Sequence, residues 1–203
     1  MRWRRYGEHA ALLDCDSLEQ MSAAHATLRA ACPDGVVDLV PGARTLLVIA
    51  HPGSSALDEA RALLDAADLA HPPSGEPREI TLDVHYDGED LELIARDAGL
   101  STKDVVARHT GAVYTVAFTG FAPGFGYLTG LPPELRQPRL ETPRTRVPAG
   151  AVGIAGEFTG IYPRTSPGGW RLLGHTTAVL FDPDAERPAL LAPGDRVRFR
   201  SVA

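Results

Sequence analysis

Residues 120–176 constrain the fold of this chain more than any other stretch. They hold 11 of the 20 glycines and 8 of the 17 prolines in the sequence. Glycine reaches left-handed backbone conformations and proline fixes φ, so this density predicts rigid loops between short strands. The stretch also carries six arginines against three glutamates, in a chain whose formal net charge is −6. Two interpretations stay open: a rigid surface that binds an anionic ligand or a partner protein, and a β-barrel with tight turns and incidental charge.

The first 70 residues predict a small α/β domain, with strands in one layer and two helices in the other. The strands are expected at residues 2–6, 10–15, 36–40 and 45–50. Ser17 and Gln20 have the spacing of a capping box and predict the start of the first helix, and Ser55 with Asp58 repeats that spacing for the second. Residues 71–78, which are rich in proline, predict a linker.

Residues 79–203 predict a second, all-β domain. Apolar and polar residues alternate over residues 80–86, which indicates a half-buried strand, and two short helices are expected between residues 87 and 109. Further strands are expected at residues 112–119, 151–155, 159–162, 170–173, 177–181, 189–191 and 196–199. Many short strands separated by turns are typical of a barrel or a sandwich.

Several kinds of site are not supported by any motif. The sequence has no GxxxxGK[ST] loop for a nucleotide, no HExxH or CxxC for zinc and no GxSxG nucleophile turn. We therefore expect no metal site. A net charge of −6 argues against a general nucleic-acid-binding protein, and no window approaches 18 consecutive apolar residues. The expectation is a soluble, cytoplasmic protein that binds neither nucleic acid nor a membrane.

Four polar residues are candidates for catalysis. Arg144 and Arg146 lie between two prolines that hold the chain extended, so both guanidinium groups are expected on the same side of the backbone, facing either one anion or solvent. His109 is either a general base or a histidine favoured by the dipole at a helix C-terminus. Ser166, in the sequence TSPGGW, is the most conspicuous serine, and its base would have to be a histidine from elsewhere in the fold.

Aromatic and glycine residues complete the candidate site. Five of the aromatic residues in the glycine- and proline-rich stretch are candidates, namely Phe121, Phe125, Tyr127, Tyr162 and Trp170. They either line a pocket or fill the barrel, and for most of them the core is the simpler interpretation. Gly169 belongs to a Gly-Gly pair that either forms a tight turn or presents backbone N–H groups to an anion.

Four blocks of sequence resemble the family of the 5-oxoprolinase B subunit, which is also named allophanate hydrolase subunit 1 and includes an inhibitor of a sporulation kinase. They read GFAPGFGYLTGLP, PRTRVPAGAVGIAG, TGIYPRTSPGGWRLLGHT and LLAPGDRVRF. The family positions that match candidate residues suggest catalytic roles for His109, Arg144, Arg146 and Ser166. They suggest substrate binding by Phe121, Pro123, Gly124, Tyr127, Tyr162, Gly169 and Trp170.

The resemblance implies a small N-terminal α/β domain and a cyclophilin-like β-barrel at residues 79–203. It further implies one component of an ATP-dependent enzyme that opens 5-oxoproline to glutamate, together with a sibling carboxyltransferase-like C subunit and an A subunit. Because the chain has no nucleotide loop of its own, a site shared between subunits is expected. The alternatives are one component of an allophanate hydrolase in urea breakdown and a non-catalytic inhibitor of a histidine kinase.

Overall fold

The computed structural model describes residues 1–71 and 77–203 and divides the chain into two compact units, Met1–Glu76 and Pro77–Ala203. Each unit is described by itself. The linker predicted at residues 71–78 falls largely on residues 72–76, which lie outside the described residues.

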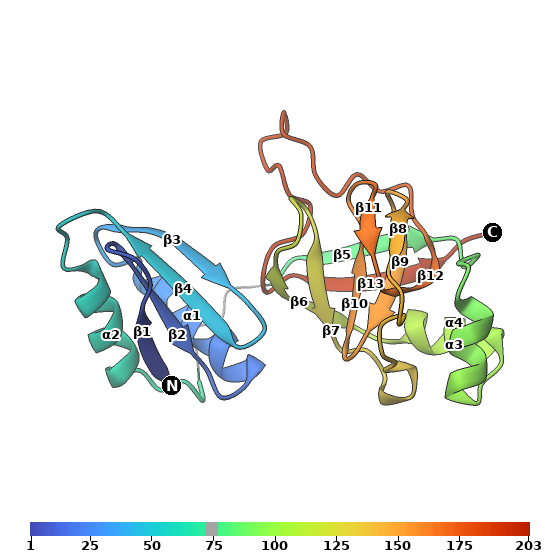
Figure 1. Cartoon of the computed structure of the whole chain (residues 1–203), viewed down its shortest axis with the longest axis horizontal. Helices are drawn as coiled ribbons and strands as arrows, with labels where there is room; N and C mark the ends of the chain where they lie inside the picture. Colours follow the sequence, from blue (N-terminus) through green and yellow to red (C-terminus); the bar gives the residue numbers. More distant parts are fainter. Residues whose placement is uncertain (72–76) are drawn as a thin grey trace. The chain divides into compact units, whose positions relative to one another are not determined.

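The first unit is a four-stranded antiparallel sheet with two helices (Figure 1). The strand order is β1-β2-β4-β3, and the elements are β1 (Arg2–Arg5), β2 (Ala10–Asp14), α1 (Leu18–Ala31), β3 (Val36–Pro41), β4 (Thr45–Ala50) and α2 (Ala56–Ala66). Alternate side chains of β2 and β4, such as Leu13 and Leu46, are buried against Met21 and Leu28 of α1 and Leu64 of α2. The period of two in the strands thus directs one face of the sheet onto the helices.

The predicted helix starts of this unit have different outcomes. Ser17 caps α1 as expected, because its hydroxyl accepts a hydrogen bond from the Gln20 backbone N–H at 3.2 Å. The Gln20 side chain, however, accepts from the Asp16 N–H at 2.8 Å and not from that of Ser17. Helix α2 begins where expected, but Ser55 makes no capping bond to the backbone, since its hydroxyl is bonded to the Glu59 carboxylate.

The second unit is built on a seven-stranded sheet that is nearly closed into a barrel. Its order is β12-β9-β10-β7-β6-β13-β5, and all of its pairs are antiparallel except β13 with β5. The strands are β5 (Glu79–Val84), β6 (Tyr114–Thr119), β7 (Gly126–Thr129), β9 (Ala151–Ala155), β10 (Phe158–Ile161), β12 (Arg171–His175) and β13 (Arg196–Ser201). The two edges meet just beyond β5, where His85 and His175 exchange two backbone hydrogen bonds of 2.9 Å.

The two short helices expected between residues 87 and 109 are confirmed, and they make this unit mixed and not all-β. Helix α3 (Leu91–Ala98) and helix α4 (Thr102–Gly111) follow β5, and a short 3-10 helix, η1 (Pro133–Leu135), follows β7. Helices α3 and α4 bury Ile94 and Val105 in the barrel core, so they are integral to the domain. Ser101 and Asp104 form a complete capping box at the start of α4.

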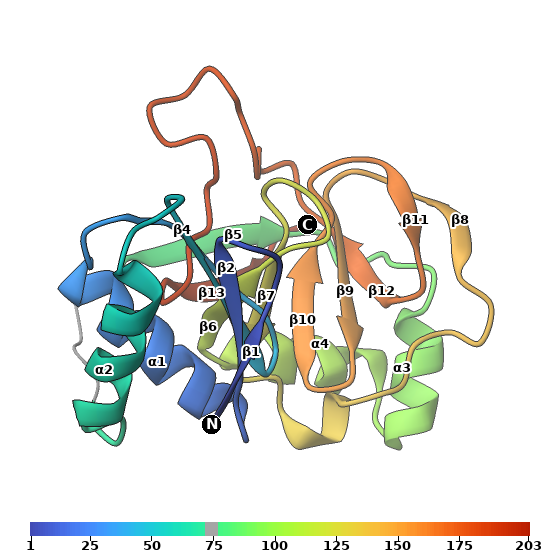
Figure 2. The same cartoon turned by 60° about the vertical axis from the view of Figure 1, so that its left-hand side comes forward.

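A separate two-stranded arm lies outside the barrel sheet (Figure 2). It pairs β8 (Arg144–Val147) with β11 (Ser166–Gly168). Strand β9 is buried along its whole length, with Val152 and Ile154 in the barrel core and Ala151 and Ala155 in a second cluster with Val147 of the arm. The strands predicted at residues 177–181 and 189–191 are instead a loop whose two sides are joined by one bridge, between Phe181 and Ala189.

Candidate functional site

The loop at residues 120–125 turns sharply between β6 and β7. Three backbone hydrogen bonds fix it: Gly120 N–H to Phe125 O at 3.2 Å, Ala122 N–H to Gly120 O at 2.8 Å and Phe125 N–H to Ala122 O at 3.0 Å. Phe121 has a φ of 67°, which is rare for a bulky residue, and is 58% exposed. Gly124, with a φ of 83°, packs so closely on Leu180 that a Cβ would lie 2.7 Å from the Leu180 carbonyl oxygen.

Two of the predicted substrate-binding aromatics, Tyr162 and Trp170, form a buried cluster with Phe125 between the sheet and the arm. Phe125, Tyr162 and Trp170 are 2%, 2% and 4% exposed, and their rings meet nearly edge to face. The pKa of Tyr162 is raised because burial disfavours the phenolate. Tyr127 is half-buried beside the cluster and Gly169 is buried. These positions therefore shape the sheet surface, and only Phe121 and Pro123 present exposed side chains.

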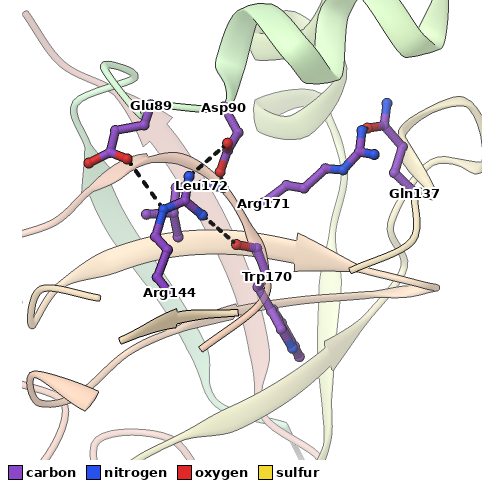
Figure 3. Close-up of polar contacts among 7 residues, drawn as sticks. All are labelled: Glu89, Asp90, Gln137, Arg144, Trp170, Arg171 and Leu172. Atoms are coloured by element: carbon purple, nitrogen blue, oxygen red, sulfur yellow. Dashed lines mark hydrogen bonds and ion pairs between the residues drawn. The ribbon is translucent and has the colours of Figure 1, made fainter. Parts of the chain in front are cut away.

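Arg144 is held by carboxylates of the strap that joins β5 to α3 (Figure 3). Its Nη2 donates to Asp90 Oδ1 at 2.8 Å, its Nε donates to Glu89 Oε2 at 3.3 Å, and its Nη1 lies 3.5 Å from the Trp170 carbonyl oxygen. Asp90, which is 5% exposed, also accepts the Leu172 backbone N–H at 2.8 Å. The hydrogen bond to Asp90 raises the pKa of Arg144. Arg144 therefore ties the arm to the barrel, whereas the sequence left the pair facing either one anion or solvent; the catalytic role of Arg144 stays a prediction.

Arg171 makes a second link between the barrel and α3. Its Nη1 donates to Asp97 Oδ2 at 2.6 Å and to the side-chain oxygen of Gln137, a pair of side chains that Figure 3 shows. The buried Gln137 amide in turn donates to the Ile94 carbonyl oxygen at 2.8 Å. The two arginines thus hold α3 from β12 and from β8, so the polar residues of this region act mainly as ties between elements.

His109 lies in the barrel core and is 0% exposed. Thr159 donates its hydroxyl hydrogen to the Gly153 carbonyl oxygen at 3.1 Å, so Thr159 Oγ1 accepts from His109 Nε2 at 3.1 Å. His109 Nδ1 is then the acceptor for the Tyr86 hydroxyl at 2.7 Å. Burial lowers the pKa of His109 to about 3. Both of its ring nitrogens are occupied within the core and burial favours its neutral form, so a catalytic role for His109 stays a prediction.

Arg146 and Ser166 remain the candidates on the arm. Arg146 is exposed, and within the described ranges no carboxylate lies close enough to form an ion pair with it. Ser166 pairs with Val147 across the arm, and its buried hydroxyl has no hydrogen-bond partner among the described residues. A buried unpaired hydroxyl is costly, so Ser166 marks a place where a polar group from outside the chain would be stabilising.

Two shallow grooves lie on the second unit. One, of about 410 Å³, is lined by Tyr86, Leu91, Lys103 and neighbouring residues of α4. The other, of about 590 Å³, lies between residues 119–124 and the loop that carries Phe181 and Leu191, and none of its lining side chains is charged. Lys103 is the one cationic side chain that lines the first groove, and the second groove has none. The phosphates of ATP carry several negative charges, so these two grooves do not fit them.

The sequence did not indicate some members of these arrangements. Asp90 and Arg144 are 54 residues apart, and no local sequence signal singled out Asp90. Phe181, which contributes to the apolar groove, lies in a segment that was expected to be a strand. In the described part of the chain no three metal-ligating side chains gather, and none of the described helices is long and apolar enough to cross a membrane.

A family model described as the carboxyltransferase domain, subdomains C and D, matches residues 1–191. The 5-oxoprolinase B subunit of Escherichia coli O157:H7 is 46% identical over 168 residues, which cover 81% of this chain and 77% of that protein. The 5-oxoprolinase B subunit of Bacillus subtilis is 43% identical over 140 residues, covering 68% of this chain and 58% of that protein.

Solved structures share the fold of this chain. The crystal structure of a protein designated TTHA0988 is 39% identical with a TM-score of 0.82, and the match covers 96% of this chain but 40% of that one. The urea amidolyase of Kluyveromyces lactis is 20% identical with a TM-score of 0.73, covering 98% of this chain and 15% of that one. At that identity the likeness shows a shared fold only.

Proposed function

Because this chain belongs to the family of the 5-oxoprolinase B subunit, we propose that it is one component of an ATP-dependent 5-oxoprolinase. The enzyme would convert 5-oxoproline, ATP and two waters to glutamate, ADP and phosphate. One water opens the lactam and the other is taken up in the hydrolysis of ATP. The observation that carries the proposal is the 46% identity over 168 residues to a protein of that name.

The geometry supports a role as part of a shared site. His109 is buried in the core and Arg144 is bound by carboxylates, so Arg146 and Ser166 are the predicted catalytic residues left to meet a substrate. An arginine stabilises negative charge that develops on an oxygen, but opening a lactam also needs proton transfer and activation of a poor electrophile. A companion protein would supply those groups and would bind ATP, which the described grooves of this chain do not fit.

The companions in this proposal are a carboxyltransferase-like C subunit and an A subunit. Two observations support a companion. The curated relatives are named as subunits. The chain also matches 40% of TTHA0988, so the same fold occurs beside further sequence in a longer chain. The likeness to urea amidolyase is one of fold alone and does not favour allophanate as the substrate.

The substrate is tested by purifying the chain with the C and A subunits from its own source and offering 5-oxoproline and allophanate in parallel. Glutamate and phosphate are expected in equal amounts from 5-oxoproline, with neither ammonia release nor phosphate release from allophanate. Turnover of allophanate without turnover of 5-oxoproline would overturn the proposal in favour of the urea-breakdown alternative. A complex that processes neither substrate but lowers autophosphorylation of a histidine kinase would favour the inhibitor alternative.

A further inference from the structure

The groove between residues 119–124 and the loop at 177–193 has the wrong chemistry for the proposed substrates. Its lining comes from glycine, alanine, proline, leucine and phenylalanine, and Thr119 supplies the one polar side chain among the described lining residues. Carboxylates, lactam amides and phosphates require paired polar groups to replace their water. Apolar side chains of another protein require only removal from water, so the lining suits a protein segment and not a small anion.

Two exposed apolar side chains line this groove: Phe121 is 58% exposed and Phe181 is 38% exposed. Val179, two residues before Phe181, is 69% exposed. Val179 and Phe181 flank the buried Leu180 in the sequence. We call Phe121, Val179 and Phe181 the apolar rim. An exposed apolar patch around a groove is typical of a protein interaction site.

The backbone of Phe121 adds an independent argument. A bulky side chain at a φ of 67° holds its backbone in a sparsely populated, strained conformation. Within the chain, Phe121 gains edge contacts with Phe125 and Tyr162 at ring centroid distances of 5.3 and 6.0 Å, yet more than half of it stays exposed. Burial of the remaining apolar surface by another molecule would offset the strain that these contacts leave.

Both sides of the groove are preorganised. Three backbone hydrogen bonds fix the Phe121 loop, and Gly124 fits directly against Leu180 and Phe181. The opposite loop is joined at its base by Leu190 N–H to Leu180 O at 3.0 Å and by Asp182 N–H to Pro188 O at 2.8 Å. A rigid surface loses little conformational entropy on binding, which favours affinity.

The charge beside the groove defines the partner. The tip of the loop, residues 182–187, carries three exposed acids, Asp182, Asp184 and Glu186, and one arginine. A complementary surface therefore has an apolar segment flanked by basic side chains. The 40% coverage of TTHA0988 shows that this fold is found together with additional chain, which supplies a candidate for such a surface.

We propose that the apolar rim and its groove dock the companion C subunit of the enzyme, through an apolar segment flanked by basic residues. This inference rests on the proposed function, because the proposed function supplies the C subunit as the companion. It adds the location of the interface. Phe121, which was predicted to bind substrate, becomes an interface residue.

The test measures the dissociation constant between the purified full chain and the purified C subunit by calorimetry. Phe121→Asp and Val179→Asp are expected to weaken binding about tenfold or more, since each places a charge in an apolar contact. The matched control is Val113→Asp. Val113 is 38% exposed and directly precedes β6, whereas Thr119, which lines the groove, is at the other end of that strand. The dissociation constant of Val113→Asp should therefore stay within about twofold of wild type. Circular dichroism and thermal unfolding establish that each variant is folded.

Unchanged affinity in folded Phe121→Asp and Val179→Asp variants would overturn the docking site and leave the proposed function standing. A self-association of this chain that these variants abolish, with binding of the C subunit intact, would also overturn it, because the occupant would be a second copy. A wild-type chain that binds the C subunit neither by itself nor in the presence of the A subunit would refute the proposed function itself, and the docking site with it.

Discussion

Replacing Asp90 is expected to destabilise the second unit far more than replacing its neighbour Glu89. Asp90 is 5% exposed and accepts two hydrogen bonds of 2.8 Å, from the Arg144 guanidinium and from the Leu172 backbone N–H. Asp90→Ala leaves both donors without their acceptor, which costs about 3–5 kcal/mol for a buried charge pair. Because the Arg144 side chain is 20% exposed and water can reach it, we expect the lower end, about 3 kcal/mol.

Glu89 supplies the matched control for this experiment. Its side chain is 74% exposed and its carboxylate lies 3.3 Å from Arg144 Nε. Exposed ion pairs contribute about 0–1 kcal/mol, so Glu89→Gln should change the free energy of unfolding by less than about 1 kcal/mol. A double-mutant cycle of Asp90→Ala with Arg144→Gln then isolates the coupling between the two side chains, expected at about 1.5–3 kcal/mol for a charge-assisted hydrogen bond.

The two tryptophans of the chain make the assay specific to one unit. Trp170 lies in the aromatic cluster of the second unit, and Trp3 packs on the core of the first. In a Trp3→Phe background, urea unfolding followed by tryptophan fluorescence therefore reports the second unit alone. A loss below about 1 kcal/mol for Asp90→Ala would refute the view that Asp90 and Arg144 tie the arm to the barrel.

Three further predictions concern single residues. Gly160→Ala should lower the free energy of unfolding by about 1–3 kcal/mol in the same urea assay, because a Cβ there would lie 2.9 Å from the Gly126 oxygen and 3.1 Å from the Phe125 and Trp170 rings. Burial lowers the pKa of His109 to about 3, so as the pH falls the unfolded chain takes up a proton at this residue before the folded chain does. The contribution of His109 to stability is therefore full above about pH 6.5, and below that pH the free energy of unfolding falls by up to about 1.4 kcal/mol per pH unit. His109→Gln should reduce this slope. Arg146→Gln should lower kcat/KM of the assembled enzyme at least about tenfold while the free energy of unfolding stays unchanged. Unchanged kinetics would show that Arg146 is a solvent-exposed side chain without a role in catalysis.

Local sequence signals predicted the elements that depend on local chemistry. The capping residues Ser17 and Ser101 lie where α1 and α4 begin, because their hydroxyls bond backbone N–H groups three residues ahead. Alternating apolar residues located β5 in the same way. Ser55 shows the limit of such signals, since its hydroxyl bonds the Glu59 side chain and makes no capping bond, although α2 still begins there.

The candidate site was less predictable, because contacts distant in sequence decide it. Arg144 and Arg146 have similar local settings, yet Asp90, 54 residues away, engages only the first. The isolated sequence around His109 does not reveal that Tyr86 and Thr159 surround it in the core. The aromatic cluster around Trp170 was open to a pocket or a core interpretation, and the arm that buries it is formed by strands whose pairing only the fold establishes.

The dependence of catalysis on a companion is the central claim, and one measurement tests it most directly. Glutamate formation from 5-oxoproline and ATP is measured with the purified full chain alone and with the chain assembled with the C and A subunits. The account predicts no turnover by the chain alone and turnover by the assembled complex. Turnover by the chain alone at the rate of the complex would contradict it, because the described residues would then have to form a complete site.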